Sequence, residues 1–122
     1  MCRSFEAFNA GEPDDSIIHP ELIYHPRTDE PDPSAHIGRD AFERLRDGFL
    51  ESFRDLRFDL LKVIDAGDRV IASTVFQGRG AASGVSVEEP YVFVYELRDG
   101  LIVEGWEFRT EQEALKAVGL EE

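Results

Sequence analysis

The stretch RFDLLKVIDAGDRVIASTVFQ, at positions 57–77, decides the fold of this 122-residue chain. Its two halves, 57–64 and 69–77, are rich in large apolar and β-branched residues. Between them stands Asp65-Ala66-Gly67-Asp68, a short turn sequence with a central glycine. Strand-forming runs around such a turn predict a β-hairpin, so an antiparallel sheet is the starting point of the fold.

The sheet continues toward the C-terminus. Small residues at 78–84 predict a loop, and the run at 85–97 predicts a long third strand. The Arg-Asp-Gly triplet at 98–100 is a second hairpin signal, and 101–109 forms the last strand. Four strands in succession make an antiparallel meander.

Two helices flank this meander in the sequence. Phe42, Leu45, Phe49 and Phe53 recur at helical spacing with charged residues between them, which predicts a long amphipathic helix that lies on the sheet. At the other end, Thr110 followed three residues later by glutamate forms a capping box that predicts a short closing helix.

The N-terminal third has weaker signals. Residues 5–10 read as the end of a helix that stops at Gly11, and 14–18 as a further helical turn. A brief strand at 22–24 follows, and the proline-rich segment 27–35 predicts an irregular loop. We expect one α+β domain over residues 1–122, with the helices gathered on one face of the sheet.

Composition limits the function. The formal net charge is −13, which excludes a surface built to bind nucleic acid or anionic membranes. No apolar run approaches the roughly 20 residues of a membrane-spanning helix, and no signal peptide is recognisable. Cys2 is the single cysteine, so no disulfide can form within the chain, and we expect a cytoplasmic protein.

Several short motifs, in order along the chain, resemble the SnoaL-like branch of the nuclear transport factor 2-like superfamily. They are Phe-Glu-Ala-Phe-Asn-Ala-Gly at 5–11, His25-Pro26, His-Ile-Gly-Arg-Asp-Ala-Phe at 36–42, Arg-Asp-Gly at 98–100 and Glu-Ala-Leu at 113–115. The resemblance implies a cone-shaped domain whose curved antiparallel sheet and helices enclose a pocket. It also implies a homodimer formed through the outer face of the sheet.

His25 is the first candidate for a catalytic residue. It precedes a proline where ketosteroid isomerases, relatives by this resemblance, carry their general base, and a histidine exchanges protons near neutral pH. The alternative is a structural histidine at the pocket rim. By the resemblance, the donors with which those isomerases stabilise the enolate correspond to Ser4 and to Phe93, or to Val92 if the register differs by one residue. Neither Phe nor Val can donate a hydrogen bond, so steroid isomerisation by that mechanism is not expected.

Glu107 is the second catalytic candidate. Strand alternation groups Val103, Gly105, Glu107 and Arg109 on one face, which the resemblance places toward the pocket. Glu107 would then be an acid or base, and Arg109 would pair with it or bind an anionic group of the ligand. The alternative is a structural ion pair.

Aromatic residues are the candidates for contact with a ligand. Tyr91, Phe93 and Tyr95 share one face of the third long strand, and together with Phe53 and Phe49 they could line a pocket for a flat apolar molecule. The alternative is an ordinary core.

No cofactor is implied. His19, His25, His36 and Asp29 have no zinc-binding spacing, and the glycines at 78–84 lack the lysine of a phosphate loop. Two functions remain open. One is an enzyme of isomerase, cyclase or dehydratase type that acts on an apolar carbonyl compound, and the other is a non-catalytic ligand-binding or dimeric accessory domain.

Overall fold

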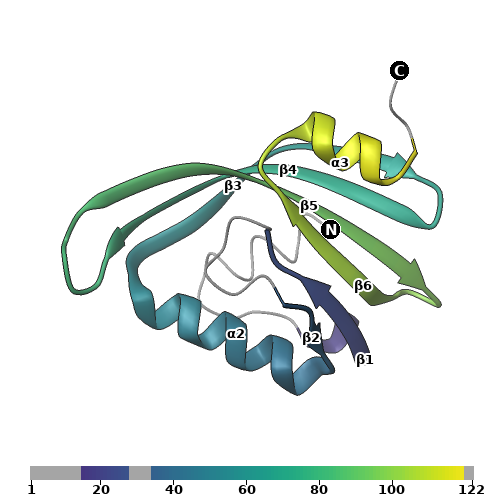
Figure 1. Ribbon diagram of the computed structural model, residues 1–122, viewed down its shortest axis with the longest axis horizontal. Coiled ribbons are helices and arrows are strands. Elements are labelled where there is room, and N and C mark those ends of the chain that lie inside the picture. Colours follow the sequence, from purple (N-terminus) through teal and green to yellow (C-terminus); the bar gives the residue numbers. More distant parts are fainter. Residues whose placement is uncertain (1–14, 28–33, 120–122) are drawn as a thin grey trace.

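The computed structural model describes residues 15–27 and 34–119, and its central feature is a six-stranded curved sheet (Figure 1). The strands are β1 (Ile18–His25), β2 (His36–Ile37), β3 (Phe53–Ala66), β4 (Arg69–Gly80), β5 (Ser86–Arg98) and β6 (Leu101–Phe108). They lie in the order β2-β1-β6-β5-β4-β3. The helices are α2 (Arg39–Ser52) and α3 (Glu111–Ala117), and a 3-10 turn, η1 (Asp15–Ile17), precedes β1. The predicted α+β class is confirmed.

The two predicted hairpin turns are confirmed. Gly67 turns the chain between β3 and β4 at φ +83°, and its N–H donates to the Asp65 carboxylate at 3.0 Å. Asp99 and Gly100 turn the chain between β5 and β6, with φ of +54° and +79°. Glycine adopts such left-handed backbone angles without steric cost, which is why both turns could be read from the sequence.

Strand β1 is longer than predicted and pairs in a way the sequence did not indicate. It runs parallel to β6, with Tyr24 opposite Gly105 and His25 opposite Trp106, whereas every other pairing in the sheet is antiparallel. The hydrogen bonds that hold β1 come from a strand about 80 residues away in the chain, so local propensity underestimates it.

We call the face of the sheet that α2 covers the inner face. Phe42 of α2 lies 4.8 Å from the ring of Tyr24, and Phe49 lies 5.1 Å from the ring of Phe76. Phe42, Leu45 and Phe49 of the predicted apolar stripe therefore do pack on the sheet. Phe53, the fourth residue of the predicted stripe, is instead the first residue of β3, because the helix ends at Ser52. Figure 1 shows the arch of β3, β4 and β5 above α2.

The opposite, outer face carries α3, which is a correction to the expectation that the helices share one face. Ala114 of α3 packs against Ile71, Val92 and Val94. These β4 and β5 side chains alternate with inner-face residues, so the sheet is apolar on both sides and needs a cover on each. Thr110 caps α3 as predicted, accepting the Glu113 N–H at 3.2 Å.

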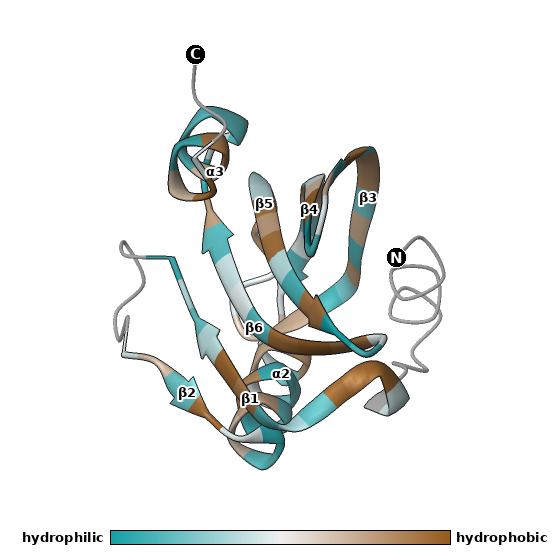
Figure 2. Cartoon of the chain, turned by 90° about the vertical axis from the view of Figure 1, so that its right-hand side faces the viewer, coloured by the Kyte–Doolittle hydropathy of each residue, from teal (hydrophilic) through white to brown (hydrophobic). Residues whose placement is uncertain are grey.

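Hydropathy bands alternate along β3 in Figure 2, as expected of a strand with two different faces. The helix predicted at residues 5–10, Ser4, and residues 28–33 of the predicted loop lie outside the described residues. No helix in the described part of the chain is long and apolar enough to cross a membrane.

Candidate functional site

A glycine on β6 lets two tyrosine rings of the candidate site pack directly over that strand. Gly105 is buried on the inner face, and a Cβ added there would stand 2.9 Å from the ring of Tyr24 and 3.4 Å from that of Tyr95. Real Cβ contacts are longer than the first of these distances. Glycine therefore lets two tyrosine rings, from β1 and β5, converge over the middle of β6.

Glu107, two residues further along β6, lies on the same face. The Tyr24 hydroxyl donates a hydrogen bond to Oε2 of Glu107, and the backbone N–H of Arg27 points at Oε1 over 3.4 Å. The carboxylate is half-buried, while Tyr24 is only 4% exposed. Tyr24 of β1 and Arg27, two residues beyond the end of β1, thus donate to a partly desolvated carboxylate on β6.

Both tyrosines beside Glu107 are strongly biased toward the neutral phenol. Burial, followed by the negative charge of Glu107, raises the pKa of Tyr24 well above its usual value of 10.0. The same two causes raise the pKa of Tyr95. The two hydroxyls consequently remain hydrogen-bond donors throughout the physiological pH range.

The aromatic side chains predicted to contact a ligand form a continuous row on the inner face of β5. Tyr91, Phe93 and Tyr95 stack on one another at centroid distances of 6.0 and 5.8 Å. Beyond Tyr91 the row continues into a cluster with Phe58 and Phe76, and Phe53 packs edge-on against Phe76 at 5.0 Å. The middle of the row lies beside Glu107, because Phe93 is the partner of Glu107 across the β5–β6 pair.

Arg27 is a part of this region that sequence reasoning missed. It is 7% exposed, and its guanidinium lies 4.1 Å from the centre of the Tyr91 ring, within cation–π range. The guanidinium also donates to the Pro90 carbonyl at 3.2 Å and to Glu89 at 3.3 Å. Its position in a proline-rich segment gave no sign that a buried cation stood there.

Tyr24 was also missed as a site residue, although the sequence held a usable signal. Leu22 and Tyr24 occupy alternate positions of β1, both are buried, and both belong to the inner-face cluster. A buried tyrosine needs a partner for its hydroxyl, so its presence on an apolar strand face pointed to an unidentified polar group.

His25 does not converge with Glu107. Since successive residues of a strand face opposite sides, His25 lies on the outer face. There its Nε2 is 2.7 Å from the Glu104 carboxylate and its ring stacks on Trp106 at 5.4 Å. Trp106 faces outward and Gly105 inward, as the alternation along β6 predicted. Nearer the start of β6 an irregularity in the pairing with β5 breaks the alternation, so that Ile102, and not the predicted Val103, belongs to the inner-face cluster. Arg109 follows the end of β6 and is exposed.

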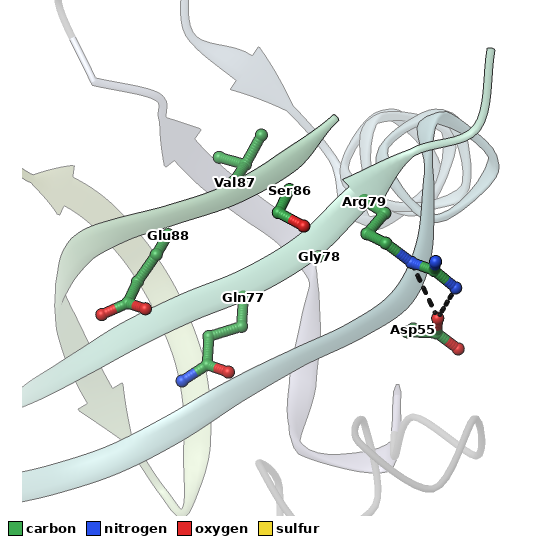
Figure 3. Close-up of a pocket in the computed structure, with 7 residues that line it drawn as sticks. All are labelled: Asp55, Gln77, Gly78, Arg79, Ser86, Val87 and Glu88. Atoms are coloured by element: carbon green, nitrogen blue, oxygen red, sulfur yellow. Dashed lines mark hydrogen bonds and ion pairs between the residues drawn. The ribbon is translucent and has the colours of Figure 1, made fainter. Parts of the chain in front are cut away.

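A surface groove lies away from this region, near the far end of β3, β4 and β5 (Figure 3). Its volume is about 310 Å³, and an ion pair in which Arg79 donates to Asp55 at 3.2 Å spans part of it. Its lining residues are Asp55, Gln77, Gly78, Arg79, Ser86, Val87 and Glu88. None of the predicted site residues lines this groove.

The chain matches the family model of the SnoaL-like domain over residues 2–105. No curated protein matches it in sequence. Among solved structures, a nuclear transport factor 2-like protein of unknown function from Burkholderia pseudomallei is similar, with a TM-score of 0.75 and 16% identity over 93% of this chain and 89% of that one.

Two further neighbours bear names that refer to polyketide cyclisation. One is a proposed SnoaL-like polyketide cyclase from Jannaschia sp., with a TM-score of 0.75 and 21% identity over 95% of this chain and 85% of that one. The other is IdmH, a proposed polyketide cyclase from Streptomyces antibioticus, with a TM-score of 0.73 and 22% identity over 94% and 92% of the two chains. At such identities these likenesses establish the fold.

Proposed function

The chain belongs to the SnoaL-like domain family, and from that premise we propose that it binds a small apolar carbonyl compound on its inner face and catalyses proton transfer on it. The reaction would be of cyclase, isomerase or dehydratase type. The observation that carries the proposal is the hydrogen bond from the Tyr24 hydroxyl to the Glu107 carboxylate, beside the aromatic row of β5.

In this proposal Glu107 is the acid–base residue. Its carboxylate removes a proton from a carbon next to the carbonyl group, and the electron pair of the broken C–H bond moves onto the carbonyl oxygen as an enolate. A neutral tyrosine hydroxyl donates to that oxygen, for which Tyr95 is the candidate. Glu107 then returns the proton to the product, so its carboxylate is restored.

The aromatic residues supply the ligand contacts. We propose that Tyr91, Phe93 and Phe53 form an apolar wall that favours a planar, weakly hydrated molecule and excludes water around the carboxylate. Tyr91 and Phe93 are only 5% and 6% exposed, so a ligand reaches them only if the aromatic cluster opens. Arg109, at the exposed end of β6, is proposed to contact a polar or anionic group at the outer end of such a ligand. His25 lies on the other face, so we assign it no chemical step.

The alternative is a domain that binds a ligand without converting it. Both oxygens of Glu107 have donors within the chain, from Tyr24 and Arg27, and an already satisfied carboxylate is less free to accept a proton from a substrate. This observation is the specific reason to retain the binding function as the second candidate.

Two further features belong to the proposal. We propose a homodimer formed through the outer face, where Trp106 and Phe108 remain partly exposed beside α3. Sedimentation of the wild type and of Trp106→Ala tests it, because a monomeric wild type would refute it. A cytoplasmic location is proposed from the single cysteine.

The experiment for the site is a thermal-shift screen of carbonyl-bearing aromatic compounds against the wild type, Glu107→Gln and His25→Ala. A compound at 100 times its dissociation constant stabilises the native state by about 2.7 kcal/mol. We expect Glu107→Gln to weaken this stabilisation and His25→Ala, the matched control on the outer face, to preserve it. If Glu107→Gln leaves binding unchanged, the inner-face site is wrong.

Turnover is then tested on whichever compound binds. The enzyme hypothesis predicts that hydrogens next to its carbonyl exchange with D₂O in the presence of the wild type, as followed by proton NMR, and that Glu107→Gln abolishes the exchange. Binding with no exchange and no product would favour the non-catalytic alternative.

A further inference from the structure

The side chain of Arg27 is anchored on a different strand from the one that Arg27 follows. The guanidinium donates to the Pro90 carbonyl and to Glu89, and it lies over the Tyr91 ring. All three partners belong to β5, whereas Arg27 follows the end of β1, and β6 lies between these strands in the sheet. The β5–β6 pairing ends at Val92 and Phe108, so the side chain reaches β5 at the end of β6, the strand that carries Glu107.

The backbone of Arg27 is constrained from the other side as well. Pro26, which is buried, joins Arg27 to the end of β1. The proline ring fixes the φ angle of Pro26 at about −65°. A segment with a stiff connection on one side and an anchored guanidinium on the other has little freedom to rotate. Its N–H, which points at Oε1 of Glu107, is directed by both constraints.

The positive charge of Arg27 has a partner of its own. The carboxylate of Glu89, a residue of β5, lies 3.3 Å from the guanidinium. The direct contact between Arg27 and Glu107 is made by the backbone N–H. Among the residues that the structure describes, Tyr24 from β1 and Tyr95 from β5 interact electrostatically with the same carboxylate.

We infer that Arg27 is a positioning residue: by anchoring its guanidinium on β5, it fixes the backbone N–H that holds the Glu107 carboxylate against Tyr24. The inference rests on the proposed role of Glu107. The anchor needs a planar group that stacks on Tyr91 and donates in two directions at once, which arginine supplies and lysine does not.

The test follows the titration of the Glu107 carboxyl itself, by NMR of protein labelled at the glutamate carboxyl carbon and assigned with Glu107→Gln. Loss of one N–H donor to the charged form disfavours ionisation. In Arg27→Met we therefore expect the titration midpoint to rise by about 0.4–1.1 pH units, the equivalent of one net hydrogen bond. Arg69→Met is the matched control, since Arg69 also pairs with a glutamate and lies near an aromatic ring, but on the outer face.

Arg27→Lys separates position from charge and guards against a methionine variant that does not fold. The positioning role predicts that the lysine variant shifts the midpoint upward like methionine, although it keeps the charge. An unchanged midpoint in Arg27→Lys, or in both variants, overturns the inference, as does an equal shift in Arg69→Met. These titrations need no ligand. The proposed function is tested separately, by the thermal-shift screen, so a failure of one can be distinguished from a failure of the other.

Discussion

Alkaline pH should weaken the fold through Tyr24 and Tyr95, and the size of the effect follows from their burial. In the folded protein the pKa of each tyrosine is raised, first by burial and then by Glu107. In the unfolded chain both return to about 10. The unfolded state therefore loses these protons first as the pH rises, and the stability that neutral tyrosines provide below pH 10 is progressively lost above it.

The size of this loss of stability depends only on the tyrosine pKa in the unfolded chain, as long as both tyrosines keep their protons in the folded protein. At pH 11 each tyrosine then lowers the free energy of unfolding by about 1.4 kcal/mol relative to pH 8, and the pair lowers it by about 2.8 kcal/mol. Phenylalanine has no proton to lose, so the substitutions Tyr24→Phe and Tyr95→Phe should each remove about half of this alkaline loss.

Urea unfolding at pH 8 and pH 11, monitored by circular dichroism, measures the effect for the wild type, both single variants and the double variant. Other groups that titrate in this range contribute equally to all four proteins, so the difference between proteins isolates the two tyrosines. If the double variant lost as much stability as the wild type between the two pH values, the hydroxyls would not be buried beside Glu107 and the site geometry would be wrong.

Three other substitutions test the packing. Gly105→Ala should lower the free energy of unfolding by about 1–3 kcal/mol in urea titrations, because the added Cβ would meet the Tyr24 ring. An unchanged midpoint of urea unfolding would mean that the Tyr24 and Tyr95 rings do not converge over β6. Gly48→Ala, in the same assay, should instead stabilise the protein by about 0.5–1 kcal/mol, since Gly48 is exposed within α2 and has nothing within 4 Å of its added Cβ. Destabilisation would contradict the exposed position of Gly48 on α2. Phe76→Ala should cost about 3–5 kcal/mol, measured by thermal unfolding, because Phe76 is 1% exposed and contacts four aromatic rings. A loss below about 1 kcal/mol, which is typical of deleting a single buried methylene group, would contradict the aromatic cluster.

The candidate site was only partly visible in the sequence. Glu107 and the aromatic row of β5 were proposed from strand alternation and from the family resemblance, and the structure places them together on the inner face. Tyr24 and Arg27, which contact Glu107, were missed, and His25, proposed as a catalytic residue with Glu107, lies on the opposite face. A residue-by-residue resemblance did not reveal which side of β1 faces α2.

The sequence by itself determined the features that depend on neighbouring residues. The helical spacing of Phe42, Leu45 and Phe49, the turn glycines Gly67 and Gly100, and the Thr110 cap each act within a few residues, so their chemistry is legible along the chain. They were enough to predict the long helix, the meander and the closing helix in order.

Only the tertiary structure decided which strands pair and which residues meet. Tyr24 and Glu107 are 83 residues apart, and they meet because β1 inserts parallel to β6 in one register. A shift of one residue would turn Tyr24 outward and His25 inward, because side chains alternate along a strand. The register is fixed by the summed burial of residues such as Leu22, Tyr24 and Ile102 against α2 and β5, and no short stretch of sequence contains that sum.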